Sequence, residues 1–91
     1  MLYRALYHPL VKEKDIPKLP KVIKERVKSV IEKRLLLEPE KYSKPLRKTL
    51  KDYRKTRIGD YRIILKVEYD NIFILGIRHR KDIYLKASKR V

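Results

Sequence analysis

Hydrophobic positions recur at two different spacings along this chain, and the spacing changes about halfway along it. Between residues 20 and 38 the apolar side chains recur every three or four positions, as on one face of an α-helix. This stripe consists of Ile23, Val27, Val30, Ile31 and Leu35. After residue 53 the apolar positions alternate or form short runs, which is typical of β-strands. The pattern therefore predicts a helical first half and a sheet-forming second half.

Proline divides the helical half. Residues 2–7 alternate loosely and predict a short strand that ends before Pro9. Pro17 and Pro20 cannot both lie inside one helix, because proline lacks the amide hydrogen and its ring clashes with the preceding turn. We therefore expect a helical hairpin, with a short first helix and a longer second one that begins near Pro20 and stops before Pro39.

The second half predicts a three-stranded meander. The expected strands are residues 53–57, 61–69 and 72–77, with turns at residues 58–60 and 70–71. Residues 38–50 are interpreted as a connecting loop, with Leu46 and Leu50 as its anchors on the core. The last ten residues, 82–91, leave room for one terminal turn or a short helix.

The middle strand of the meander has two faces of different character. One face carries Tyr61, Ile63, Leu65 and Val67. The other carries Arg62, Ile64, Lys66 and Glu68. Since successive side chains of a strand point to opposite sides, we expect the first face to join the core. The second face is expected to meet solvent or a ligand, with Arg62 on it.

The net charge of the chain indicates what kind of partner it binds. The 91 residues predict a single domain, 1–91, and carry 26 Lys and Arg against 11 Asp and Glu, a formal net charge of +15. Residues 41–91 alone hold 16 basic against 5 acidic residues. A one-signed excess of this size favours a polyanionic partner. A solvated, lysine-rich surface is the plainer alternative.

The residue types that are missing also restrict the chemistry. The chain has no cysteine and only two histidines, His8 and His79. Disulfides and thiolate metal sites are therefore excluded, and we expect no metal and no cofactor. No apolar run approaches the length of a membrane span or of a signal peptide. We accordingly expect a cytoplasmic protein that does not contact the membrane.

Two short motifs in the β half, in this order and spacing, resemble the RelE/ParE superfamily of toxins from toxin–antitoxin pairs. They are residues 57–64, with the sequence RIGDYRII, and residues 79–84, with the sequence HRKDIY. The strand that runs into His8-Pro9 and the hairpin through residues 15–19 fit the same family. The resemblance covers nearly the whole chain. It implies an α+β fold of order β-α-α-β-β-β, in which a small antiparallel sheet packs against an N-terminal helical hairpin.

The resemblance also implies an activity. The RelE branch consists of metal-free endoribonucleases that cut messenger RNA in the ribosomal A site, whereas the ParE branch inhibits DNA gyrase without nuclease residues. This chain fills the positions of the RelE branch with Lys55, Arg62, Arg80 and Tyr84. Cleavage through the ribose 2′-OH needs a base, an acid and cations for the phosphorane. Arg62 and Arg80 suit the last task, while the base is left open between Lys55, His79 and Tyr84.

Further RNA contacts and partners follow from the same resemblance. We expect the RNA to be held by Tyr53, Arg54, Arg57, Arg78 and Lys81, since cations interleaved with tyrosines suit phosphates and exposed bases. The expected partners are the ribosome, messenger RNA and a cognate antitoxin, acidic or amphipathic, that wraps around the toxin. The toxin–antitoxin hetero-oligomer is expected to bind operator DNA.

Overall fold

The computed structural model describes residues 2–91 and contains a five-stranded sheet of order β1-β5-β4-β3-β2. The strands are β1 (Arg4–Tyr7), β2 (Lys44–Pro45), β3 (Arg54–Ile58), β4 (Tyr61–Glu68) and β5 (Asn71–His79). The meander β3-β4-β5 is antiparallel, as predicted. By contrast, β1 runs parallel to β5. A parallel neighbour needs a crossover connection, which here begins with the helical hairpin. The α+β class is confirmed.

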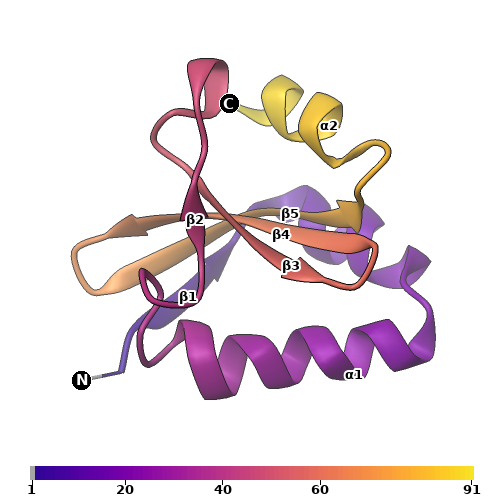
Figure 1. Cartoon of the computed structure of the whole chain (residues 1–91). Coiled ribbons are helices and arrows are strands. Elements are labelled where there is room, and N and C mark those ends of the chain that lie inside the picture. Colours follow the sequence, from indigo (N-terminus) through magenta and orange to yellow (C-terminus); the bar gives the residue numbers. More distant parts are fainter. Residues whose placement is uncertain (1) are drawn as a thin grey trace.

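Proline divides the helices as the sequence indicates. A helical turn, η1 (Val11–Asp15), continues into η2 (Ile16–Lys18), where Pro17 lies in the first turn. The long helix consists of α1 (Lys21–Val30) and its continuation η3 (Ile31–Leu35). Two short helices follow later in the chain, η4 (Lys48–Leu50) and α2 (Ile83–Arg90). Figure 1 shows α1 below the sheet and α2 above it.

The sheet is covered on both faces, which corrects one expectation from the sequence. The larger cluster lies between α1 and the sheet and includes Ile63, Leu65 and Leu35, all fully buried. A second cluster lies under α2 and joins Ile64 of β4 to Leu75, Ile83, Ala87 and Leu50. The face that was expected to meet solvent is therefore partly core. The terminal segment forms a helix of 8 residues and brings its own apolar side to the sheet.

Side chains from η1 and α2 hydrogen-bond to the exposed edge of β5. β1 ends at Tyr7, so β5 has no strand partner beyond Ile74 on that side. Asp15 accepts a hydrogen bond from the backbone N–H of Ile77 at 3.0 Å, and Arg90 donates to the carbonyl of Leu75 at 3.0 Å. Two side chains thus satisfy edge groups that a strand would otherwise pair.

Gly76 allows α2 to approach the sheet closely. A Cβ atom at this position would lie 3.0 Å from Cδ1 of Ile83 and 3.4 Å from a guanidinium nitrogen of Arg90. The first distance is tighter than ordinary packing, so Ile83 would have to give by a few tenths of an ångström to admit a side chain here. Glycine leaves this space free for α2.

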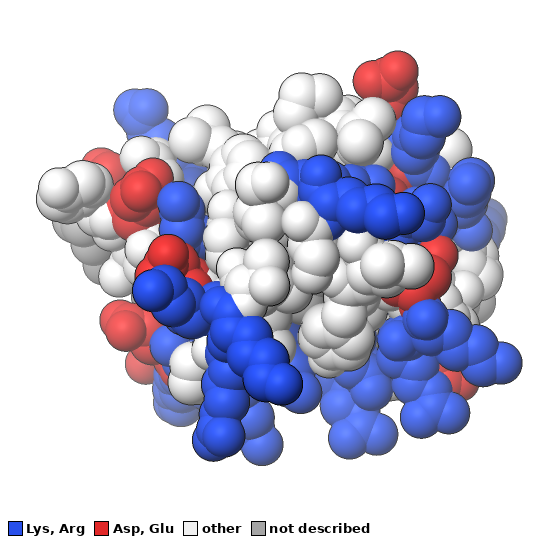
Figure 2. Space-filling view, turned by 90° about the horizontal axis from the view of Figure 1, so that it is seen from above, with Lys and Arg blue, Asp and Glu red and all other residues white. Residues whose placement is uncertain are grey.

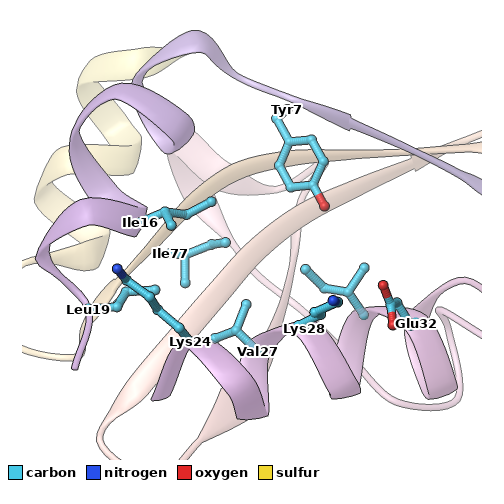
Figure 3. Close-up of a pocket in the computed structure, with 9 residues that line it drawn as sticks. Tyr7, Ile16, Leu19, Lys24, Val27, Lys28, Glu32 and Ile77 are labelled. Atoms are coloured by element: carbon cyan, nitrogen blue, oxygen red, sulfur yellow. The ribbon is translucent and has the colours of Figure 1, made fainter. Parts of the chain in front are cut away.

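The layer between α1 and the sheet leaves an apolar pocket of about 270 Å³. Figure 3 shows the ring of Tyr7 above α1, with its hydroxyl pointing toward the helix. Burial, and then the nearby carboxylate of Glu32, raises the pKa of the Tyr7 phenol. None of the residues predicted to cut or bind RNA lines this pocket. The predicted RNA-binding and catalytic residues therefore lie outside this pocket.

Candidate nucleic-acid site

Three arginines form a row across the sheet on its α2 side. The strand register pairs Arg57 of β3 with Arg62 of β4, and Arg62 with Arg78 of β5. Directly paired residues share a face, so the three side chains leave the sheet on the same side as Ile64. Lys55, two residues before Arg57, shares this face. The meander therefore brings together four of the cations that the sequence selected.

The helix α2 adds Tyr84 to this row. The ammonium nitrogen of Lys55 lies 6.0 Å from the centre of the Tyr84 ring, at the limit of a cation–π contact. Tyr84 also packs against the second core cluster. Residues far apart in sequence thus meet because α2 folds back over β5 and β4, above the sheet in Figure 1.

Arg62 is held in place by the backbone. Its side chain is almost buried, at 9% exposure, and one guanidinium nitrogen donates to the carbonyls of Gly59 and Tyr61 at 2.8 and 2.9 Å. A guanidinium has five donors in a rigid fork, so these two bonds leave further N–H groups available. A fixed cation with spare donors suits the binding of a phosphoryl group whose charge increases during a reaction.

Arg78 does not fit the expectation of a free RNA-binding cation. Its Nη2 donates to Asp82 at 2.7 Å and its Nη1 to Asp15 at 2.9 Å. The hydrogen bond to Asp82 is the main cause of its raised pKa, and Asp15 adds to it. Both acids neutralise Arg78 and tie it to α2 and to η1. Its role in the structure is to hold elements together.

Asp15 is the centre of this ion-pair cluster. Its carboxylate is fully buried and also accepts two hydrogen bonds from Arg90, at 2.7 and 2.8 Å. Burial acts to raise the pKa of Asp15, but the hydrogen bonds from Arg90, Ile77 and Arg78 together lower it. The sequence gives no sign of this role for Asp15. An acid between a lysine and an isoleucine carries no signal, since its partners lie more than 60 positions away.

Arg80 lies at the end of the row and is accessible. Its side chain is 56% exposed, with Nε 3.8 Å from a carboxylate oxygen of Asp60. Its backbone N–H donates to the carbonyl of Asp60 at 2.7 Å, which fixes the chain beside the β3–β4 turn. The loop after β5 therefore brings Arg80 close to Gly59, whose carbonyl binds Arg62.

His79 lies on the other face of the sheet. It pairs with Tyr61, and the two rings meet edge to face with centroids 5.2 Å apart. Its Nδ1 accepts a hydrogen bond from the N–H of Lys81 at 3.1 Å. Because Tyr61 belongs to the α1 side, the structure does not bring His79 to the face of Lys55 and Arg62.

Of the other residues predicted to contact RNA, some make contacts within the protein and one is exposed. Arg54 donates to the hydroxyl and carbonyl of Ser43, at 2.7 and 3.0 Å, and to the carbonyl of Glu40. It therefore clamps the preceding loop instead of facing outward. Tyr53 packs against the α2-side cluster, with the ammonium of Lys66 at 5.4 Å from its ring. Lys81 is exposed.

Among residues 2–91, no group of three or more His, Cys, Asp or Glu side chains is arranged to hold a metal ion. None of the helices in this part of the chain is both long and apolar enough to cross a membrane.

Figure 2 looks down on the α2 side and shows Lys and Arg around much of its margin, with isolated acids among them.

This chain is similar to known proteins in both sequence and fold. The family described as the ParE toxin of the type II toxin–antitoxin system matches residues 4–84. Toxin RelG of Mycobacterium tuberculosis is 36% identical over 73 residues, which is 78% of this chain and 84% of the relative. The RelBE2 toxin–antitoxin complex of the same organism contains a chain with a TM-score of 0.80 and 28% identity, covering 88% of this chain and 100% of that one.

A second solved toxin–antitoxin complex is also similar in fold. The RelB–RelE antitoxin–toxin complex of Methanococcus jannaschii matches with a TM-score of 0.70 and 27% identity over 87% of this chain and 94% of that chain. The family match spans most of the chain and covers both sequence motifs. The chain belongs to the ParE toxin family of the RelE/ParE superfamily and is a toxin of a type II toxin–antitoxin system.

Proposed function

We propose that this toxin is an endoribonuclease that cuts messenger RNA in the ribosomal A site and so inhibits translation. The observation that carries the proposal is the group formed by Lys55, Arg62 and Tyr84 on one face, with Arg80 at its end. A fixed arginine beside a lysine–tyrosine pair suits a phosphoryl-transfer site, which needs charge stabilisation and proton transfer.

The proposed reaction uses the RNA as its own nucleophile and needs no metal. The ribose 2′-OH attacks the adjacent phosphorus, a 2′,3′-cyclic phosphate forms, and the bond to the leaving 5′ oxygen breaks. Arg62 and Arg80 bind the phosphoryl oxygens and stabilise the extra negative charge of the phosphorane. The proton of the 2′-OH passes to a base, and a second group supplies a proton to the 5′ oxygen.

The proposed acid and base are Lys55 and Tyr84, in an order that the geometry leaves open. They lie together, whereas His79 lies across the sheet and is omitted from the proposed set. Arg57 and Lys81 are proposed to bind neighbouring phosphates. Arg54 and Arg78 are omitted from the RNA contacts, because their guanidinium groups are already occupied.

A cognate antitoxin is the proposed regulator. Structural relatives from Mycobacterium tuberculosis and Methanococcus jannaschii are toxin–antitoxin complexes. The net charge of +15 on this chain fits an acidic or amphipathic antitoxin that wraps around it. We propose that the two act in the cytoplasm, where the ribosomes are, and that their hetero-oligomer binds operator DNA.

Inhibition of DNA gyrase is the second candidate, because the matching family is described by its ParE toxins. One experiment separates the two. The toxin is expressed from an inducible promoter, messenger RNA 5′ ends are mapped, and DNA breaks are counted. New 5′ ends within coding sequences, lost in Arg80→Ala but kept in the matched surface variant Arg4→Ala, support the nuclease. Intact transcripts together with broken DNA support gyrase.

A further inference from the structure

A groove of about 410 Å³ runs along the outer edge of β3. β2 pairs with β3 only at Lys55 and Arg54, so the edge beyond them has no strand neighbour. The end of the long helix and the loop before β2 form the opposite wall. The hydroxyl of Thr56 donates to the carbonyl of Tyr42 at 3.0 Å and ties that loop to β3.

The charge of the groove has one sign. Its basic lining residues are Arg34, Lys41, Lys44, Lys55, Arg57 and Arg62, and no acid lines it. Arg34, Lys41 and Lys44 belong to a part of the chain that the sequence analysis interpreted as helix and connecting loop, away from the proposed chemistry. Like charges that face one open space repel each other, so the arrangement favours an anion between them.

Tyr42 orders two of these cations. The guanidinium carbon of Arg34 lies 5.5 Å from the ring centre, and the ammonium nitrogen of Lys41 lies 5.4 Å from it. Long cationic side chains lose conformational entropy when they bind, and a ring that already restricts them lowers this loss. Lys41 has one acidic neighbour, Glu38 at 3.9 Å, and both side chains are mostly exposed.

We propose that this groove binds the phosphodiester backbone of RNA beside the cleaved nucleotide. Lys55, Arg57 and Arg62 line the groove and also lie on the α2 side of the sheet, so one strand of RNA passes from the groove to the reacting phosphate. Arg34 and Lys44 hold the flanking phosphates. The proposal rests on the proposed nuclease function for the choice of RNA as the ligand and for its position beside the cleaved nucleotide.

The test measures binding and leaves catalysis aside. The probe is a fully 2′-O-methylated RNA strand of about 12 nucleotides, alone or annealed to its complement, since it presents phosphates without a reactive hydroxyl. Its Kd is followed by fluorescence anisotropy over a range of salt concentrations. The double variant Arg34→Gln/Lys44→Gln is compared with Arg4→Gln/Lys12→Gln, which removes the same charge near β1, at the opposite edge of the sheet.

We expect the groove variant to flatten the plot of log Kd against log salt by about 1.4 on the single strand, because each lost phosphate contact contributes about 0.7. The control variant should keep the wild-type slope. An effect on the single strand supports the proposed path of messenger RNA through the groove. An effect on the duplex alone overturns that path, because it assigns the groove to folded RNA. Equal losses in both variants, or none, overturn the proposal even if the toxin cuts RNA.

Discussion

The two faces of the sheet differ in what holds them together. On the α1 side, the larger cluster of apolar side chains packs against a long amphipathic helix. On the α2 side the apolar cluster is small, and the helix is held in addition by Asp15, Arg78 and Arg90. The first face stabilises the fold. The second carries the candidate RNA site, so its helix is held by directional ion pairs that fix where Tyr84 lies.

Removing the charge of Asp15 should have the largest effect on the ion pairs that hold the α2 side. In Asp15→Asn, the buried guanidinium of Arg90 loses its anion and Arg78 keeps only Asp82, which should lower the free energy of unfolding by about 3 to 5 kcal/mol. Urea denaturation measures the loss. Asp60→Asn is the matched control, since it breaks an exposed pair with Arg80 and should cost less than about 1 kcal/mol. Equal losses would show that the cluster is not special.

The contribution of Asp15 to stability should also depend on pH. Because the folded-state pKa of Asp15 lies below its unfolded value, its stabilising effect is complete above the unfolded pKa of about 3.9 and is lost as pH falls through the folded pKa. The gap in unfolding free energy between wild type and Asp15→Asn should therefore be constant near neutral pH and close below about pH 3.9. A gap that stays constant to pH 2, within about 0.5 kcal/mol, would contradict this.

Arg62 tests the functional side of the comparison. Arg62→Gln keeps a hydrogen-bond donor but loses the charge, and should lower the rate of messenger RNA cleavage on translating ribosomes by about 100 to 1,000-fold. Single-turnover kinetics at saturating toxin measure this loss at the chemical step. Arg54 clamps the loop before β2, so Arg54→Gln should slow cleavage far less. A loss below about 10-fold for Arg62→Gln would remove it from the proposed machinery.

Gly76 tests how closely α2 must approach. Gly76→Ala places a methyl group 3.0 Å from Ile83 and should cost about 1 to 3 kcal/mol of unfolding free energy. It should also reduce cleavage, because the clash displaces the start of the helix that carries Tyr84. Gly76→Ala/Ile83→Val makes room for the methyl group and should recover part of both. No recovery would mean that the space under α2 is not the limiting feature.

The smallest expected effect comes from two adjacent isoleucines. Ile63 and Ile64 are both fully buried, but Ile63 faces α1 and Ile64 faces α2. Ile63→Val and Ile64→Val should each cost about 0.5 to 1.5 kcal/mol. Only Ile64→Val should also slow cleavage, since it loosens the packing beneath α2. Similar rates in the two variants would show that the helix position does not depend on this contact.

The sequence by itself determined the local structure. The helical period, the prolines and the turn residues placed the long helix after Pro20 and the three strands of the meander, because these features depend on neighbours within a few positions. The two motifs also identified the superfamily. The alternation in β4 correctly separated Ile63 from Ile64, although it could not say that α2 would cover the second.

Only the tertiary structure decided which cations are available. Arg54, Arg62, Arg78 and Arg80 look alike in sequence, yet one clamps a loop, one is fixed by carbonyls, one is neutralised, and one is largely exposed. The parallel contact of β1, the reach of Asp15 to Arg90 and the groove wall from Arg34 to Lys44 likewise join distant segments. Hydrogen bonds and ion pairs depend on distance in space, which no spacing along the chain records.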